Sequence, residues 1–166
     1  ITYEFENIPA ATAMIVAARR PVLPNHHILE TVQDRLVEKD FVSGLGIGTA
    51  AYVDVASAQA LCEAIKNIGL PAVIKTRRFG YDGKGQAVIR NESQIEPAWE
   101  QLGRAQLLLE KYVAFQHELS VIGVRNAGGR TAFYPPIENV HREGILRKST
   151  APAPSSTVAS TVSDCR

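Results

Sequence analysis

The sequence predicts an α+β fold, and three observations indicate this class. The middle of the chain holds a strand–strand–helix–strand unit over residues 71–110. Strand-like runs separated by turn-forming residues follow this unit. Before it, apolar residues recur at the three- and four-residue spacing that is typical of helices. Together these segments predict a chain of mixed helices and strands.

The first third of the chain is predicted to be mainly helical. Residues 1–5 alternate like a buried strand, and Pro9 suits the first turn of a helix that runs to about residue 20. Residues 27–43 then read as one broken helix or two short ones. The apolar face of this stretch would consist of Ile28, Leu29, Val32, Leu36, Val37 and Phe41.

Another strand and helix lead into the middle unit. Residues 49–55 are strand-like, and Ser57 caps a helix that stops at Gly69. The middle unit has two strands, a helix capped by Ser93 and a third strand. These four elements are expected over residues 71–75, 85–90, 94–102 and 106–110.

The last part of the chain is predicted to hold strands and a tail. The strand-like runs are residues 117–125, 131–134 and 137–141. Residues 126–129 form a loop rich in turn formers, and residues 142–144 turn the chain into residues 145–148. Residues 149–166 contain eight Ser or Thr and read as a frayed tail or a truncated element.

Composition and charge exclude several classes of function. The 166 residues carry 18 Lys plus Arg and 17 Asp plus Glu, so the net charge is +1. A general nucleic-acid or membrane-surface binder would need a wide basic field. No apolar run approaches the length that spans a bilayer. Cys62 and Cys165 are too few for a disulfide framework or a zinc knuckle, so a reducing, cytoplasmic setting fits best.

The two ends of the sequence suggest an internal piece of a larger protein. The chain opens on Ile1 without an initiator Met, and no signal peptide explains this start. We therefore expect further sequence on both sides.

A glycine-rich segment over residues 75–85 is the first candidate for binding an anion. It combines four cations and one acid with glycines, namely Lys75, Arg77, Arg78, Lys84, Asp82, Gly80, Gly83 and Gly85. Glycine lets backbone N–H groups approach a ligand closely, and clustered N–H groups bind anions. The segment therefore suits a polyphosphate. Asp82-Gly83 is also a strong turn signal, so a plain hairpin is the other interpretation, and the two are compatible.

Two better-known phosphate motifs do not fit. A P-loop needs Gly, four residues and then Gly-Lys-Ser/Thr, and residues 80–85 have a different spacing. Residues 44–49 resemble a dinucleotide-binding fingerprint, but they lack its last glycine and lie between a helix and a strand in the wrong order. We interpret residues 44–49 as a helix end and a linker.

Further candidates follow the middle unit. Glu110 ends an apolar strand. Its side chain and the backbone of residues 110–113 could bind an adenine edge. The alternative is a strand that leaves the core with a solvated charge pair. Glu118 could accept hydrogen bonds from sugar hydroxyls or be simply exposed. His141 lies beside Arg142 and could contact an anion.

The remaining histidines and cysteines support neither a metal site nor a covalent nucleophile. His26 and His27 are expected in a solvated turn before a helix. No pair of histidines has metal-ligand spacing, and neither cysteine has a local histidine partner.

These segments, in this order, resemble the 5-(carboxyamino)imidazole ribonucleotide synthases, ATP-grasp ligases of purine biosynthesis. The resemblance extends from residue 1 to about residue 154. The motifs that carry it are Lys75, residues 77–86, residues 110–113, Glu118 and residues 141–146, with residues 3–7 and 33–39 in support.

The resemblance implies a partial ATP-grasp fold in three parts. Residues 1–30 would be the end of a Rossmann-like pre-ATP-grasp domain. Residues 31–112 would be linker helices and a small β-β-α-β lid lobe. Residues 113–166 would be the truncated start of an antiparallel C-terminal lobe, with ATP lying between this lobe and the lid.

The resemblance also assigns roles to residues. Arg35 and Lys75 would hold phosphates, and the lid segment would close over them. That segment comprises Gly80, Tyr81, Asp82, Gly83, Lys84, Gly85 and Gln86. The adenine would be framed by Glu110, Lys111, Tyr112 and Val113. Glu118 would hold the ribose, and His141 would complete the nucleotide site. Tyr81, Asp82 and Lys84 would also face the aminoimidazole ribonucleotide as catalytic residues.

The chemistry implied is an ATP-dependent carboxylation. Bicarbonate would attack the γ-phosphate to give carboxyphosphate. That species, or CO2 released from it, would carboxylate the amino group of 5-aminoimidazole ribonucleotide on the way to IMP. A lid that carries cations and N–H donors would neutralise and shield that water-labile species. Another ATP-grasp carboxylase, a formyl-transferring ligase, or a non-catalytic nucleotide-binding fragment are the alternatives.

The resemblance further implies cofactor and partners. Mg²⁺ would accompany ATP, with its ligands beyond this chain, so the piece alone should not catalyse the full reaction. The partners would be the small-molecule substrates, with no nucleic acid and no membrane. A homodimer is expected of the full-length enzyme.

Overall fold

The computed structural model of the chain describes residues 1–80 and 84–154. The chain divides into two compact units, Ile1–Val113 and Ala114–Arg166. Both contain antiparallel sheet, and the first also contains the helices, so the α+β prediction is confirmed. Among the described residues, no helix has the length and apolar character needed to cross a membrane.

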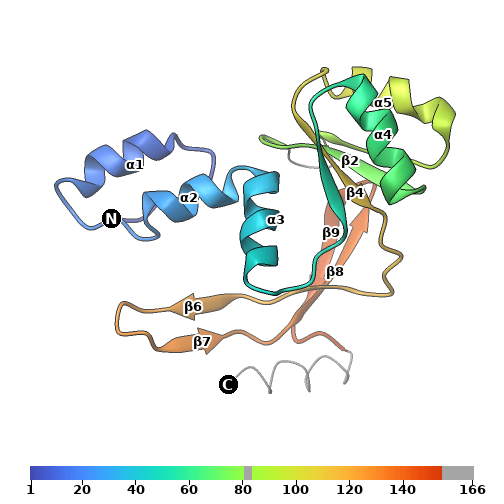
Figure 1. Cartoon of the computed structure of the whole chain (residues 1–166). Coiled ribbons are helices and arrows are strands. Elements are labelled where there is room, and N and C mark those ends of the chain that lie inside the picture. Colours follow the sequence, from blue (N-terminus) through green and yellow to red (C-terminus); the bar gives the residue numbers. More distant parts are fainter. Residues whose placement is uncertain (81–83, 155–166) are drawn as a thin grey trace. The chain divides into compact units, whose positions relative to one another are not determined.

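The first unit begins with three short helices, α1 (Ala10–Ala17), α2 (His26–Val32) and α3 (Arg35–Gly44) (Figure 1). The break predicted within residues 27–43 is present, because α2 ends at Val32 and Asp34 caps α3 by accepting from the backbone N–H of Leu36. Leu29 packs with Ala13 and Val22 in a small core.

Two expectations for this region are wrong. Residues 1–5 form no strand, and Ile1 and Phe5 are exposed. His26 is the first residue of α2 rather than part of a turn before it. Much of the expected apolar helix face is also exposed, because only Leu29 of that face reaches the small core. The exposed members are Ile28, Val32, Val37 and Phe41.

A four-stranded antiparallel sheet forms the rest of the first unit, in the order β1-β4-β2-β3. Its strands are β1 (Tyr52–Val55), β2 (Ala72–Thr76), β3 (Gln86–Ile89) and β4 (Leu107–Lys111). Helix α4 (Ala58–Ile68) connects β1 to β2, and the short helix η1 (Glu92–Gln94) with α5 (Ile95–Gln101) connects β3 to β4. The strand–strand–helix–strand unit is thus present, and β1 extends it by pairing with β4.

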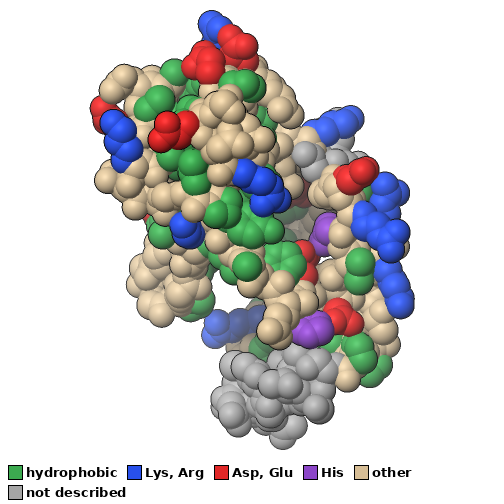
Figure 2. All heavy atoms as spheres, turned by 90° about the vertical axis from the view of Figure 1, so that its right-hand side faces the viewer, with side chains coloured by type: hydrophobic (Ala, Val, Ile, Leu, Met, Phe, Trp, Pro, Cys, Tyr) green, Lys and Arg blue, Asp and Glu red, His purple; other side chains and the backbone are tan. Residues whose placement is uncertain are grey.

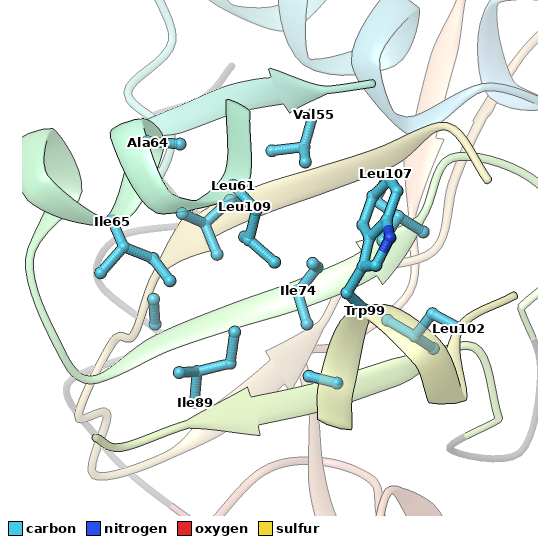
Figure 3. Packing of buried hydrophobic residues seen from close by; sticks show 12 residues of the cluster. Val55, Leu61, Ala64, Ile65, Ile74, Ile89, Trp99, Leu102, Leu107 and Leu109 are labelled. Carbon is cyan, nitrogen blue, oxygen red and sulfur yellow. The ribbon is translucent and has the colours of Figure 1, made fainter. Parts of the chain in front are cut away.

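The main core lies between this sheet and helices α4 and α5, which cover one of its faces (Figure 1). Figure 3 shows Leu61 and Ile65 of α4 and Trp99 of α5 meeting apolar side chains of the strands. Because side chains alternate along a strand, Ile74 and Leu109 point to the helices, whereas their neighbours Lys75 and Glu110 are directed to the other face.

The helix caps were predicted with mixed success. Ser57 caps α4 as expected, with its Oγ accepting from the backbone N–H of Ala60, and Gly69 ends that helix at φ +75°. Ser93 is not the cap of α5. It lies inside η1, and its hydroxyl donates to the side chain of Asn91.

The second unit consists of two small antiparallel sheets. One has the order β5-β8-β9, from β5 (Glu118–Ser120), β8 (Ile137–Arg142) and β9 (Ile145–Thr150). The other pairs β6 (Gly123–Arg125) with β7 (Thr131–Phe133) across the predicted loop. The predicted strand over 117–125 therefore divides between two sheets. Strand β9 also continues to Thr150, so the expected tail starts later than residue 149.

Candidate functional site

Three charged side chains meet on the sheet face opposite the main core. Lys75 of β2 and Glu110 of β4 are diagonal neighbours, since Lys75 is paired with Leu108 and Glu110 with Val73. The Nζ of Lys75 lies 3.0 Å from Oε2 of Glu110, and the Nζ of Lys39 on α3 lies 3.6 Å from Oε1. Glu110 is 8% exposed, so this carboxylate is one of the few buried charges described.

Arg35 is hydrogen-bonded to the first half of the glycine-rich segment. Its Nη1 donates to the carbonyl of Thr76 at 2.7 Å, and its Nη2 donates to the carbonyl of Gly80 at 3.2 Å. The backbone N–H of Arg35 also donates to the carbonyl of Arg77 at 2.9 Å. The first residue of α3 is thereby fixed to the end of β2, where the segment begins.

Asp34 and Arg77 form a second connection at the same place. Nε and Nη2 of Arg77 both reach the Asp34 carboxylate, at 2.9 and 2.6 Å. Burial alone would raise the pKa of Asp34, but hydrogen bonds from Arg77 and from the Leu36 backbone outweigh it and lower that pKa. The hydrogen bond to Asp34 raises the pKa of Arg77.

A third connection joins Gln33 to Arg78. The Oε1 of Gln33 accepts from Arg78 Nη2 at 2.7 Å. The Nε2 of the same amide donates to the carbonyls of Glu6 and Ile8. Gln33 is buried, and its bonds link the N-terminal segment and the end of α2 to the glycine-rich segment.

Two glycines closely approach other atoms where the segment's ends meet. Gly85 has φ +77°, and a Cβ there would lie 2.7 Å from Oγ1 of Thr76 and 3.1 Å from the Cα of Gly80. A Cβ on Gly80 would lie 3.0 Å from the Arg35 guanidinium. At Gly85, the positive φ and the close approach together favour a residue without a side chain. The hairpin interpretation is confirmed, since β2 and β3 pair across the segment.

The other predicted nucleotide contacts of this unit are distributed around these groups. Gln86 pairs with Lys75 across β2 and β3, and Lys111 ends β4. The backbone N–H of Tyr112 donates to the carbonyl of Pro71, whereas Val113 is 52% exposed. Lys84 is described, but Tyr81, Asp82 and Gly83 lie outside the described residues. A pocket of about 110 Å³ adjoins Arg35 and Gly80, with Glu6, Asn7 and Phe79 among its lining residues.

The second unit brings together Glu118 and His141. Nδ1 of His141 lies 3.0 Å from Oε1 of Glu118, on neighbouring strands β8 and β5. A second such pair joins His117 and Glu138 at 2.6 Å. Figure 2 shows histidine side chains beside acidic ones on the face it presents. Over residues 1–80 and 84–154, no group of three or more His, Cys, Asp or Glu could hold a metal ion.

Comparison with known families identifies the fold to which this β-hairpin with its cations and glycines belongs. Residues 40–165 match the ATP-grasp domain. The chain belongs to the ATP-grasp family. This assignment confirms the fold that the resemblance implied.

Named ATP-grasp proteins are similar to this chain over most of its length. The N5-carboxyaminoimidazole ribonucleotide synthase of Pseudomonas aeruginosa is 44% identical over 151 residues, which are 91% of this chain and 42% of the relative. The crystal structure of the Thermus thermophilus synthetase has a TM-score of 0.86 at 43% identity, covering 98% of this chain and 44% of that one. The Staphylococcus aureus N5-carboxyaminoimidazole synthetase, complexed with ADP, has a TM-score of 0.91 at 31% identity, with the same coverage. The chain thus spans about two fifths of the curated relatives' length.

Several residues of this candidate site are not indicated by the sequence. Lys39, Asp34 and Gln33 belong to a stretch that supported the resemblance, but no role was assigned to them individually. Each contacts a residue at least 40 positions away or a buried carboxylate, which no local pattern reveals. A signal was present in the run Gln33-Asp34-Arg35, three polar residues at the junction of two helices.

Proposed function

We propose that this chain is part of an ATP-dependent ligase that carboxylates 5-aminoimidazole ribonucleotide with bicarbonate, giving 5-(carboxyamino)imidazole ribonucleotide in purine biosynthesis. The observation that carries the proposal is Arg35, whose guanidinium donates to the carbonyls of Thr76 and Gly80 in the glycine-rich segment that follows Lys75. The 44% identity to a synthase of this product supports the choice of substrate.

The proposed roles follow from charge and position. Arg35 and Lys75 bind phosphate oxygens of ATP, and backbone N–H groups of residues 80–86 add neutral donors. Residues 110–113 frame the adenine with backbone groups. In the second unit, Glu118 accepts hydrogen bonds from ribose hydroxyls and His141 contacts the nucleotide. Tyr81, Asp82 and Lys84 contact the aminoimidazole ribonucleotide.

The reaction proceeds in two group transfers. A bicarbonate oxygen attacks the γ-phosphorus, the bond from that phosphorus to the ADP oxygen breaks, and carboxyphosphate forms. The amine nitrogen of 5-aminoimidazole ribonucleotide then bonds to the carboxyl carbon, the bond from that carbon to the phosphate oxygen breaks, phosphate leaves, and the nitrogen loses a proton. Fixed cations stabilise the negative charge in both steps. Mg²⁺ would neutralise ATP phosphates when bound, and no ligand for it is assigned among the described residues. A cytoplasmic homodimer stays a prediction.

The test is ATP turnover by the full-length gene product. We expect phosphate release from ATP to require both 5-aminoimidazole ribonucleotide and bicarbonate. Turnover that ignores both compounds, or that responds to a different acceptor, would contradict the proposed substrate and favour another ATP-grasp reaction.

A further inference from the structure

One buried carboxylate is shared by two ammonium groups in the first unit. The Glu110 side chain is 10% exposed, and those of Lys39 and Lys75 are 19% and 25% exposed. Lys75 approaches one carboxylate oxygen and Lys39 the other. The cluster therefore has one more positive charge than negative charge in a poorly solvated place.

This surplus matters because Lys75 has two candidate partners. A buried carboxylate that loses its only counter-ion is strongly destabilised. If Lys75 alone neutralised Glu110, a phosphate could take Lys75 only by leaving that carboxylate unpaired. With Lys39 also present, Glu110 keeps one cationic partner when Lys75 binds another anion.

Lys39 is held in place independently of Lys75. It belongs to α3, whereas Lys75 belongs to β2. Its Nζ lies 5.4 Å from the centre of the Tyr52 ring, within cation–π range. The Tyr52 hydroxyl donates to Asp40 at 2.7 Å, which fixes the same turn of α3 to β1. The position of Lys39 thus does not depend on what Lys75 binds.

We propose that Lys39 is a positioning residue for nucleotide binding: it keeps the Glu110 carboxylate neutralised so that Lys75 is available to a phosphate. The inference rests on the proposed nucleotide site but not on the identity of the carboxylated substrate. Lys39 acts through Glu110 and makes no contact with the nucleotide.

The test is a double-mutant cycle on ADP affinity, measured by calorimetry with the full-length gene product. Lys39→Met should weaken ADP binding about tenfold or more, because Glu110 then retains Lys75. In a Glu110→Gln background the same change should have an effect below about twofold, because no carboxylate remains to hold Lys75. Lys39→Arg should keep wild-type affinity, and Lys66→Met on the exposed face of α4 is the matched control.

Each other result has a definite meaning. Unchanged affinity in Lys39→Met would overturn the proposal. Equal weakening in both backgrounds would also overturn it, since Lys39 would then contact the nucleotide or act only on folding. Lys39→Gln replaces Lys39→Met if thermal unfolding shows the latter to be misfolded. Absence of ADP binding by the wild-type protein would instead contradict the proposed function.

Discussion

The guanidinium of Arg77 donates hydrogen bonds to the carboxylate of Asp34 from two nitrogens, at 2.9 and 2.6 Å. The pair joins the start of α3 to the chain just beyond β2. Both side chains are largely buried, with 16% and 13% exposure. Asp34 of this ion pair is adjacent to Arg35 in the sequence. The pair therefore fixes the position of the proposed phosphate-binding guanidinium relative to the glycine-rich segment.

Asp34→Asn should lower the free energy of unfolding by about 2–3 kcal/mol at neutral pH, the magnitude of a charged hydrogen bond. Asparagine remains a good helix cap, so the change isolates the charge. Because the pKa of Asp34 is lowered in the folded protein, its stabilisation is complete above about pH 5. It decreases below about pH 4 and is lost as the pH falls through the lowered pKa. Chemical denaturation from pH 7 to pH 3 measures both effects.

Asp54→Asn is the matched control for that experiment. Asp54 also contacts Arg77, at 3.3 Å, but its side chain is 43% exposed. We expect a much smaller loss of stability. Equal losses in the two variants, or a difference between wild type and Asp34→Asn that stays constant down to pH 3, would contradict the assignment of the lowered pKa to this pair.

Gly85→Ala should be more destabilising than Gly46→Ala. Both glycines have φ +77°, so both changes have the same backbone cost, of about 1–2 kcal/mol. Only at Gly85 would the new Cβ lie within 3 Å of another atom, Oγ1 of Thr76, whereas nothing lies within 4 Å at Gly46. Unfolding by denaturant should separate the two variants, and equal stabilities would indicate that residues 76 and 85 approach less closely.

Local signals were sufficient to predict much of the fold. Ser57 and Gly69 mark the ends of α4 because capping and positive φ depend on neighbouring residues alone. The Glu143-Gly144 turn between β8 and β9 was found for the same reason, since both residues adopt positive φ. Such features are determined within a few positions of sequence.

Pairing across long distances could not be predicted. Strand β1 joins the sheet through Tyr52 and Glu110, which are far apart in the sequence. The boundary between β5 and β6 falls at Val121 and Ile122, two β-branched residues that favour a continuous strand and hide the change of sheet. Alternation over residues 1–5 predicted a strand, but alternation does not supply the neighbouring strand that a sheet needs.

The candidate site shows the same difference between local signals, which the sequence reveals, and long-range contacts, which it does not. Glycines and cations over residues 75–85 were recognisable because their types are unusual together. The ion pairs of Lys75 with Glu110 and of Asp34 with Arg77 depend on which strands and helices adjoin. Side-chain identity thus indicated the ligand class, whereas the partners that hold those side chains came only from the fold.

Lys75→Ala should weaken ATP binding by the full-length protein by about 10- to 150-fold, the equivalent of one charged hydrogen bond to phosphate. His26→Ala on α2 should leave affinity unchanged, since no ligand contact is assigned to it. Equilibrium binding of ATP to both folded variants checks this, and equal effects would show that the phosphate site is misplaced.

Glu118→Gln should weaken ATP binding about tenfold, because a neutral amide accepts weaker hydrogen bonds from the ribose hydroxyls than a carboxylate does. Glu138→Gln offers a close control, since Glu138 also contacts a histidine on the same sheet. We expect Glu138→Gln to keep wild-type affinity in the same titration. Loss of affinity in both variants would point to the stability of the sheet rather than to ribose binding.

The fate of bicarbonate oxygen tests the central claim most directly. Bicarbonate labelled with ¹⁸O is supplied to the full-length gene product with ATP and 5-aminoimidazole ribonucleotide, and the phosphate released is analysed by mass spectrometry. If carboxyphosphate forms as proposed, the phosphate carries one ¹⁸O atom and 5-(carboxyamino)imidazole ribonucleotide accumulates in equal amount. Phosphate without ¹⁸O, released while ATP is consumed, would contradict the account, because its new oxygen would then come from water.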